Sequence, residues 1–215
     1  MSDTELDNTT PADEATRDVE APVDSPSPEE IARSKSALAQ VLKFGDPVLR
    51  SSASRVEEFG ASLEAEVERM IQIALDAPGS GLAAPQIGIL KRVFVYRPDQ
   101  GDEIFPLVNP EIEWSSDETE TAVEGCLSIP DVALEIERAV SVRLRAQDLE
   151  GGEILLEETG WNARILQHES DHLEGVLTID RAPRDQRKGA LRALRRGESY
   201  WPPDLISDDD GEPEA

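Results

Sequence analysis

The chain has 215 residues, which is enough for one domain of ordinary size with a sizeable core. Hydrophobic residues make up 38% and aromatic residues 4%, and these low fractions predict that part of the chain is unfolded. The net charge of −25 argues against general nucleic-acid binding, and the single cysteine excludes an internal disulfide.

The excess negative charge gathers at the two ends of the chain. Residues 1–36 carry 10 acidic and 3 basic residues with four prolines, and residues 204–215 carry 6 acidic residues and no basic ones. Both compositions predict a disordered acidic segment, so we expect a folded unit at residues 37–203. The chain lacks a secretory signal and any apolar run of about 18 residues, so we expect no membrane association and a cytoplasmic location.

The folded unit is predicted to begin with an apolar segment and turn at residues 41–50, followed by a helix at 62–75. A loop rich in small residues comes next, at 79–88. Alternating and β-branched patterns then predict strands at 92–97, 105–109, 111–114, 132–137, 141–145 and 153–156.

Helical spacing returns at Asn162 and ends at Gly175, and a second, basic helix is predicted at 184–196. One helix, then several strands of antiparallel type, then helices indicate the α+β class rather than alternating βαβ units.

The strongest chemical signal is the segment His168-Glu169-Ser170-Asp171-His172. Residues four apart on a helix lie one turn above each other, so His168 and His172 can bind one ion from the same side. Glu169 then lies where it can reach a water on that ion. This HExxH spacing is a known metallopeptidase signature, although two incidental histidines beside acids would also produce it.

A catalytic metal site usually has three protein ligands and one open position, so a third ligand is needed. Cys126, in the segment Glu124-Gly125-Cys126-Leu127-Ser128, is one candidate, and a downstream carboxylate is the other. A thiolate with two imidazoles suits zinc or ferrous iron. Cys126 could instead be a small buried hydrophobe.

The loop Gly79-Ser80-Gly81-Leu82-Ala83-Ala84-Pro85-Gln86 has few side chains large enough to build a core. Its glycines allow close backbone approach to a ligand, and Gln86 offers an amide donor for a developing oxyanion. Taken alone, the loop could equally be a structural turn.

Three motifs together resemble the signature motifs of the peptide deformylase family: GSGLAAPQ at 79–86, EGCLS at 124–128 and QHESDHLEG at 167–175. The segment VLKFGDPVLR at 41–50 is similar to the start of that family's domain. The resemblance covers about residues 40–182. It implies an α+β fold in which antiparallel strands surround a central HExxH helix.

The resemblance also implies a reaction, which is hydrolysis of the formyl group from the N-terminal formyl-methionine of new polypeptides. Cys126, His168 and His172 would bind one divalent metal, usually Fe2+, with Zn2+, Ni2+ or Co2+ able to replace it. Glu169 would be the general base and then the acid, while Gln86 and the Leu127 backbone N–H would hold the formyl oxygen. Gly81 and Gly125 would align the peptide like an added strand.

Two positions depart from the family pattern. Ser80 stands where an apolar residue is usual, and it would line part of the substrate pocket. An arginine that contacts the peptide in many members is missing after EGCLS, and the role does not transfer to Arg138. The basic helix at 184–196 suggests weak contact with the ribosome, although a basic solvated face explains it as well.

Two rival functions remain open. A zincin-type metallopeptidase would use Glu198 as its third ligand, but it leaves the first two motifs unexplained. A non-catalytic protein that binds peptide N-termini would keep the metal only for structure, and such a site normally closes with a fourth ligand.

Overall fold

The computed structural model describes residues 26–98 and 103–202, and in them two antiparallel sheets. The five-stranded sheet has the order β1 (Gly81–Ala83), β2 (Val93–Tyr96), β3 (Phe105–Ser115), β6 (Ser141–Gln147) and β7 (Glu153–Thr159). The two-stranded sheet pairs β4 (Thr119–Cys126) with β5 (Ile129–Ala139). Helices combined with antiparallel strands confirm the predicted α+β class.

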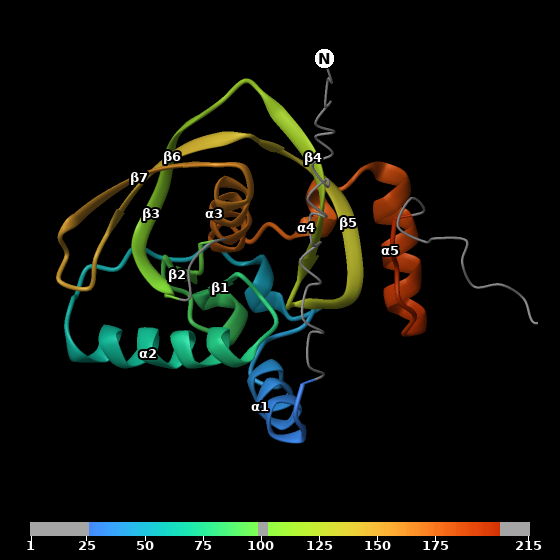
Figure 1. Ribbon diagram of the computed structural model, residues 1–215, viewed down its shortest axis with the longest axis horizontal. Coiled ribbons are helices and arrows are strands. Elements are labelled where there is room, and N and C mark those ends of the chain that lie inside the picture. The colour runs from blue at the N-terminus through green and yellow to red at the C-terminus, as the bar shows by residue number, and fades with distance from the viewer. Residues whose placement is uncertain (1–25, 99–102, 203–215) are drawn as a thin grey trace, which may run out of the picture.

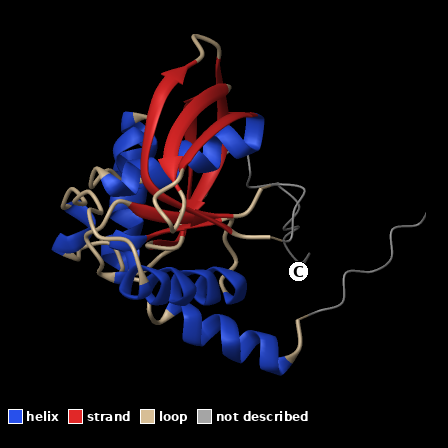
Figure 2. Cartoon of the chain, turned by 90° about the vertical axis from the view of Figure 1, so that its left-hand side faces the viewer, coloured by secondary structure: helices blue, strands red, loops and turns tan. Residues whose placement is uncertain are grey.

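Helices pack around these strands (Figures 1 and 2). They are α1 (Pro28–Leu38), α2 (Ala61–Asp76), α3 (Gly160–Leu173), α4 (Thr178–Arg181) and α5 (Arg184–Arg196), with the short 3-10 helices η1 (Pro47–Arg50) and η2 (Ala84–Ile87). α3 contacts strands of both sheets, and α5 lies beside β5 on the outside (Figure 1). Within the described ranges, none of the helices has the length and apolarity needed to cross a membrane.

The core forms where each helix buries its apolar face. On α3, Ala163, Leu166 and Leu173 are fully buried in a cluster with Phe94 and Leu144 of the large sheet. A second cluster joins α2 to β1 and β2, and a third joins β5 to α4 and α5. Each fully buried leucine or phenylalanine stabilises the fold by about 1.5–3 kcal/mol. This burial fixes which face of α3 is turned away from the large sheet.

Three strands differ from the sequence prediction. β1 lies in a stretch predicted as a loop, and its pairing with β2 makes it a strand. β4 was not predicted, because its residues are mostly polar and exposed and lack a continuous apolar face. β3 was predicted as two strands interrupted by Pro110, but it continues through the proline with a register shift between Val108 and Glu111. Asn109 at this irregularity has φ of 52°, a left-handed conformation that asparagine tolerates better than most residues.

The N-terminal boundary also differs from the sequence prediction. Residues 28–36, expected to be part of a disordered arm, belong to α1. The Ser27 side chain accepts from the Glu30 N–H, the Glu30 side chain accepts from the Ser27 N–H, and Pro28 occupies the first turn. Ala37 at the end of the helix is buried in the same cluster as α2. The remaining predicted disorder, at residues 1–25 and 204–215, lies outside the described residues.

Candidate active site

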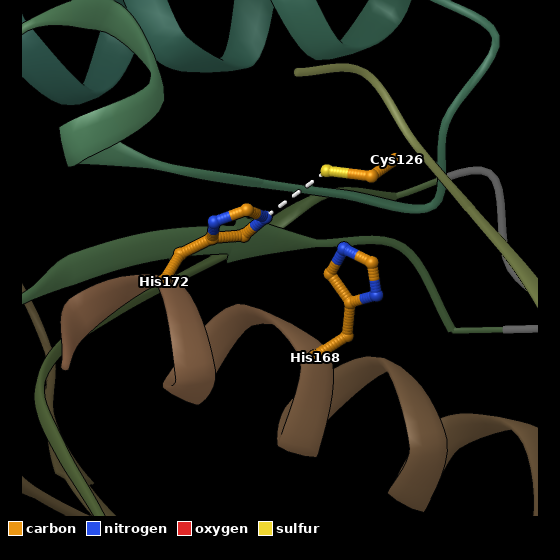
Figure 3. A group of neighbouring side chains, drawn as sticks. All are labelled: Cys126, His168 and His172. Atoms are coloured by element: carbon orange, nitrogen blue, oxygen red, sulfur yellow. Dashed lines mark hydrogen bonds between the residues drawn. The ribbon is translucent and has the colours of Figure 1, made fainter. Parts of the chain in front are cut away.

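α3 carries two histidines on the face opposite its packed apolar residues. His168 and His172 lie one turn apart, and both imidazoles extend from α3 toward Cys126 (Figure 3). The Cys126 Sγ is 3.4 Å from the His172 Nε2, and the ligand atoms of the three residues all lie within 4.8 Å of one another. α3 and the β4–β5 hairpin therefore bring three donor side chains together, although Cys126 and His172 are 46 residues apart in the chain.

Cys126 is the last residue of β4, at the tight turn into β5. The pairing is regular up to Gly125 and Ala133, and then shifts so that Cys126 lies opposite Ile129. This irregularity redirects the chain next to the site, a common use of such a shift. The side chain packs partly against the apolar cluster of β5, α4 and α5.

Glu124 lies behind the first histidine and is only 4% exposed. Its Oε2 is 2.9 Å from the His168 Nδ1, so the Nδ1–H donates and the Nε2 lone pair is left for a ligand. The guanidinium groups of Arg138 and Arg164 hold the other side of the carboxylate, with Nε–Oε1 and Nη1–Oε1 distances of 2.9 and 2.8 Å. Arg138 also donates a hydrogen bond to Asp171, so His168 is held by a buried network of charges.

The charges in this network shift several pKa values. Burial alone would raise the pKa of Glu124, but the hydrogen bonds and charges of His168 and Arg138 outweigh it and hold that pKa below its ordinary value. Burial would likewise raise the pKa of the Cys126 thiol, but His172 and His168 lower it well below the ordinary value. The thiolate is the form that binds metals.

Glu169 is buried beside the histidines, and burial raises the pKa of its carboxyl group. Its Oε2 has no hydrogen-bond partner among the described residues, although buried carboxylate oxygens normally have one. A Cβ at Gly81 would lie 2.7 Å from the Glu169 Cδ, so only glycine leaves room for this side chain. Glu169 therefore has an open acceptor at the floor of the site.

Gln86 lies in η2, and its orientation is fixed by the backbone. The Ala83 N–H donates to the Gln86 Oε1 at 2.8 Å, and the Nε2 then lies 3.2 Å from the Ser128 Oγ and 3.8 Å from the Cys126 Sγ. The donor end of the amide therefore faces the cysteine.

The segment 42–44 joins this loop to the hairpin turn. The Leu42 N–H donates to the Gln86 carbonyl at 2.7 Å, and the Phe44 N–H donates to the Ser128 carbonyl at 2.8 Å. Between them, the Lys43 Nζ donates to the Leu127 carbonyl at 3.0 Å. These bonds tie the two proposed oxyanion donors, the Gln86 amide and the Leu127 N–H, to the same short segment, residues 42–44.

A cleft of about 500 Å³ opens onto these groups. Its lining includes eight of the nine site residues expected from the sequence: Ser80, Gly81, Gln86, Gly125, Cys126, Leu127, His168 and Glu169. The ninth, His172, is 1% exposed and lies beneath the cleft beside Cys126. The structure therefore brings all nine residues to one place.

These residues fit a divalent metal ion. Three observations support the fit: the three donor atoms lie close together, the His168 Nδ1 is turned to Glu124 so that the Nε2 faces the other donors, and the histidines lower the pKa of Cys126 toward the thiolate. The donor set of one thiolate and two imidazoles leaves a position open, as in catalytic sites. Within the described residues, the cluster of possible metal ligands does not include Glu198.

The polypeptide deformylase family model matches residues 38–188 of the chain. The chain belongs to this family. It is 49% identical over 159 residues to the peptide deformylase of Thermotoga neapolitana, covering 74% of this chain and 93% of that one. It is 43% identical over 167 residues to peptide deformylase 1 of Corynebacterium glutamicum, covering 77% and 98%.

Solved deformylase structures share the fold. The peptide deformylase of Synechococcus elongatus in complex with actinonin superposes with a TM-score of 0.68 at 39% identity, covering 74% of this chain and 86% of that one. The enzyme of Thermotoga maritima superposes with a TM-score of 0.64 at 45% identity, covering 66% and 96%. The family places a divalent metal in its active site, in agreement with the donor cluster of this chain.

Sequence reasoning missed the residues that support this deformylase site. Glu124 was considered only as part of a motif, and Arg164 was not considered. A signal was present, because Arg164 lies four residues before His168 and so on the same helix face. An arginine beside a predicted metal ligand in a buried stretch requires an acidic partner, and Glu124 was the acid nearest to Cys126.

Proposed function

We propose that this chain hydrolyses the formyl group from the N-terminal formyl-methionine of newly made polypeptides and releases formate, with Cys126, His168 and His172 binding one divalent metal ion. The observation that carries the proposal is the cluster of three donor atoms within 4.8 Å beside the buried Glu169, whose Oε2 has no partner among the described residues. Membership of the deformylase family supports the same reaction.

The metal in this proposal is ferrous iron, with zinc, nickel and cobalt as ions that the same donors can hold. When bound, such an ion supplies a Lewis acid that activates water at neutral pH. Glu124 orients the His168 ring toward the ion, and Arg138 and Arg164 keep Glu124 ionised.

Glu169 takes a proton from the attacking water and later returns one to the leaving amine. Its raised pKa suits both steps, because a carboxylate with a higher pKa is a stronger base, and more of its protonated form is present at neutral pH to act as the acid. The Gln86 amide and the Leu127 N–H donate to the formyl oxygen as negative charge develops there. The Ala83 N–H pre-positions the Gln86 amide, and the Lys43 ammonium, which donates to the Leu127 carbonyl, holds the Leu127 residue in place.

The substrate peptide lies in the cleft between β1 and β4, with Gly81 and Gly125 beside its backbone and Ser80 near its side chains. Glycine on both sides lets the peptide approach closely, and no atom lies within 4 Å of a Cβ built at Gly125.

The test is formate release from a formyl-methionyl peptide by the iron-loaded chain. We expect release from the wild type, a loss of at least about 100-fold in Glu169→Gln with metal retained, and no change in Glu198→Gln. Glu198 is exposed beside Arg196 and is the third ligand that the zincin alternative requires. No release from the wild type, or loss of metal in Glu198→Gln, would contradict the proposal.

A second proposal concerns the partner of α5. Its exposed residues Arg184, Arg187, Lys188, Arg192, Arg195 and Arg196 are basic in an acidic protein, while Ala190 and Ala193 pack inward. We propose that this face contacts the ribosome weakly through RNA phosphates. Reversing the charges of Arg192, Arg195 and Lys188 should abolish co-sedimentation with ribosomes, while reversal of Arg33 and Lys35 on α1 should not. Equal co-sedimentation of both variants would reject the contact.

We also propose that residues 37–203 are the catalytic unit and that the protein acts in the cytoplasm. The match of the family model to residues 38–188 supports the first statement. The single cysteine, which the site uses as a thiolate, suits a reducing compartment and supports the second.

A further inference from the structure

The segment after α5 returns to the cleft. Gly197 ends the helix with φ of 67°, and the chain then reverses direction. The Tyr200 N–H donates to the Asp131 carbonyl and the Ala133 N–H donates to the Tyr200 carbonyl, both at 2.9 Å. Trp201, the next residue, therefore reaches the lining of the cleft that holds Glu169.

The backbone on both sides of Trp201 is fixed. Tyr200 packs against the apolar cluster of β5, α4 and α5, and a Cβ at Gly189 of α5 would lie 3.1 Å from the Tyr200 Cζ. Pro202 is buried, and a residue that precedes a proline is restricted to extended conformations. The fold thus holds Trp201 firmly while its side chain remains 51% exposed.

The cleft that Trp201 lines has an apolar stretch, interrupted by the exposed Asp131. The same cleft is lined by Pro130, Val132, Ala133 and by Trp161 at the start of α3, which is 44% exposed. An extended peptide bound with its formyl end at Glu169 advances about 3.3 Å per residue, so a peptide that runs toward Trp201 brings the residues after its methionine to this wall. A large, rigid indole offers contact area at low entropic cost to many different side chains.

We propose that Trp201 is a specificity-determining residue, which binds the apolar side chain of one of the two residues that follow the formyl-methionine of the substrate. The inference rests on the proposed deformylation, because it assigns a further part of the same substrate. It predicts a preference for leucine or phenylalanine over alanine at one of these two positions.

The experiment uses the full metal-loaded chain and two peptide series, formyl-Met-X-Ala-amide and formyl-Met-Ala-X-amide, with alanine, leucine or phenylalanine at X. We expect Trp201→Ala to lower kcat/KM about three- to tenfold for the leucine and phenylalanine peptides of one series, through KM. Formyl-methionine amide, which ends before the wall, should be hydrolysed at the wild-type rate, and Trp201→Phe should retain most of the preference.

Trp114→Ala is the matched control, because Trp114 is 50% exposed in β3 and does not line the cleft. Equal loss on formyl-methionine amide in Trp201→Ala, or no loss on any peptide, would overturn the proposal. Calorimetric binding of the product peptides Met-Leu-Ala-amide and Met-Ala-Leu-amide tests it without turnover. Trp201→Ala should weaken the binding of one of these peptides by the same three- to tenfold factor. If the variant binds both peptides as tightly as the wild type does, the proposal is overturned. Failure of the deformylation itself would appear separately, as absence of turnover with formyl-methionine amide.

Discussion

Replacing Glu124 by glutamine tests the network behind the site most directly. The carboxylate accepts hydrogen bonds from the Arg138 Nε and Nη2, the Arg164 Nη1 and the His168 Nδ1, at 2.9, 3.0, 2.8 and 2.9 Å. Glutamine keeps the shape but removes the charge, and one acceptor oxygen becomes a donor NH2 group. That group would face two other donors if the remaining oxygen stayed with Arg164.

The structure sets the size of the effect. Breaking a buried ion pair by removing one partner costs about 3–5 kcal/mol, and a single hydrogen bond to a charged group about 1.5–3 kcal/mol. Arg138 keeps its bond to the Asp171 Oδ2 at 2.6 Å, which limits the loss. We therefore expect Glu124→Gln to lower the unfolding free energy by about 3–5 kcal/mol, and to weaken metal binding about 10–100-fold because His168 loses its orienting acceptor.

The assay is urea unfolding of the chelator-treated protein, combined with metal competition against a chromophoric chelator. Glu120→Gln is the control, because Glu120 lies on the same strand with an exposed side chain. A loss in Glu124→Gln within about 1 kcal/mol of the control, with equal metal affinity, would show that the network neither stabilises the fold nor orients the ligand.

Three further outcomes follow from the same contacts. Since the folded pKa of Glu124 is lowered, its contribution is present above about pH 4.3 and is lost as pH falls through the folded pKa. The difference in urea-derived unfolding free energy between wild type and Glu124→Gln should then shrink below about pH 4, and a constant difference down to pH 3 would contradict it. Gly81→Ala should lower kcat at least about tenfold in formate-release assays by displacing Glu169, whereas Gly125→Ala, with open space at its Cβ in the free protein, should raise KM by crowding the peptide and keep kcat within about threefold. Lys43→Met removes two hydrogen bonds to backbone carbonyls at 3.0 and 3.1 Å. Lys43→Met should lower the unfolding free energy by about 1–2 kcal/mol and should lower kcat by a larger factor than it raises KM. An unchanged unfolding free energy with unchanged kcat would exclude a positioning role for Lys43.

Much of the fold was readable from local pattern. The helical period predicted a helix from Asn162 and a basic helix at 184–196, which correspond to α3 and α5. The period of two predicted most strands of the large sheet, because one face of those strands is buried and the other solvated. The spacing of His168 and His172 fixes their relation within a single helix, so it needed no tertiary information.

The features that escaped prediction depend on contacts between distant segments. β4 is polar, and its ladder with β5 decides its conformation. The spacing places Arg164 on the face of His168, but its partner Glu124 is 40 residues away and only the fold brings them together. β1 is only three residues long and lies in a stretch predicted as a loop, and its pairing with β2 makes it a strand. Trp201 lies beyond the last predicted helix, and the hydrogen bonds and packing of Tyr200 bring it to the cleft.

The hydrogen bonds from residues 42–44 to Gln86 and Ser128, together with the histidines on α3, have a consequence for the order of synthesis. The chain leaves the ribosome N-terminus first, so residues 42–44, Gln86 and Cys126 emerge from the exit tunnel well before His168 and His172. The donor cluster cannot close until α3 has left the exit tunnel. Under the proposed activity, a chain that is still being synthesised is therefore inactive until His172 has emerged.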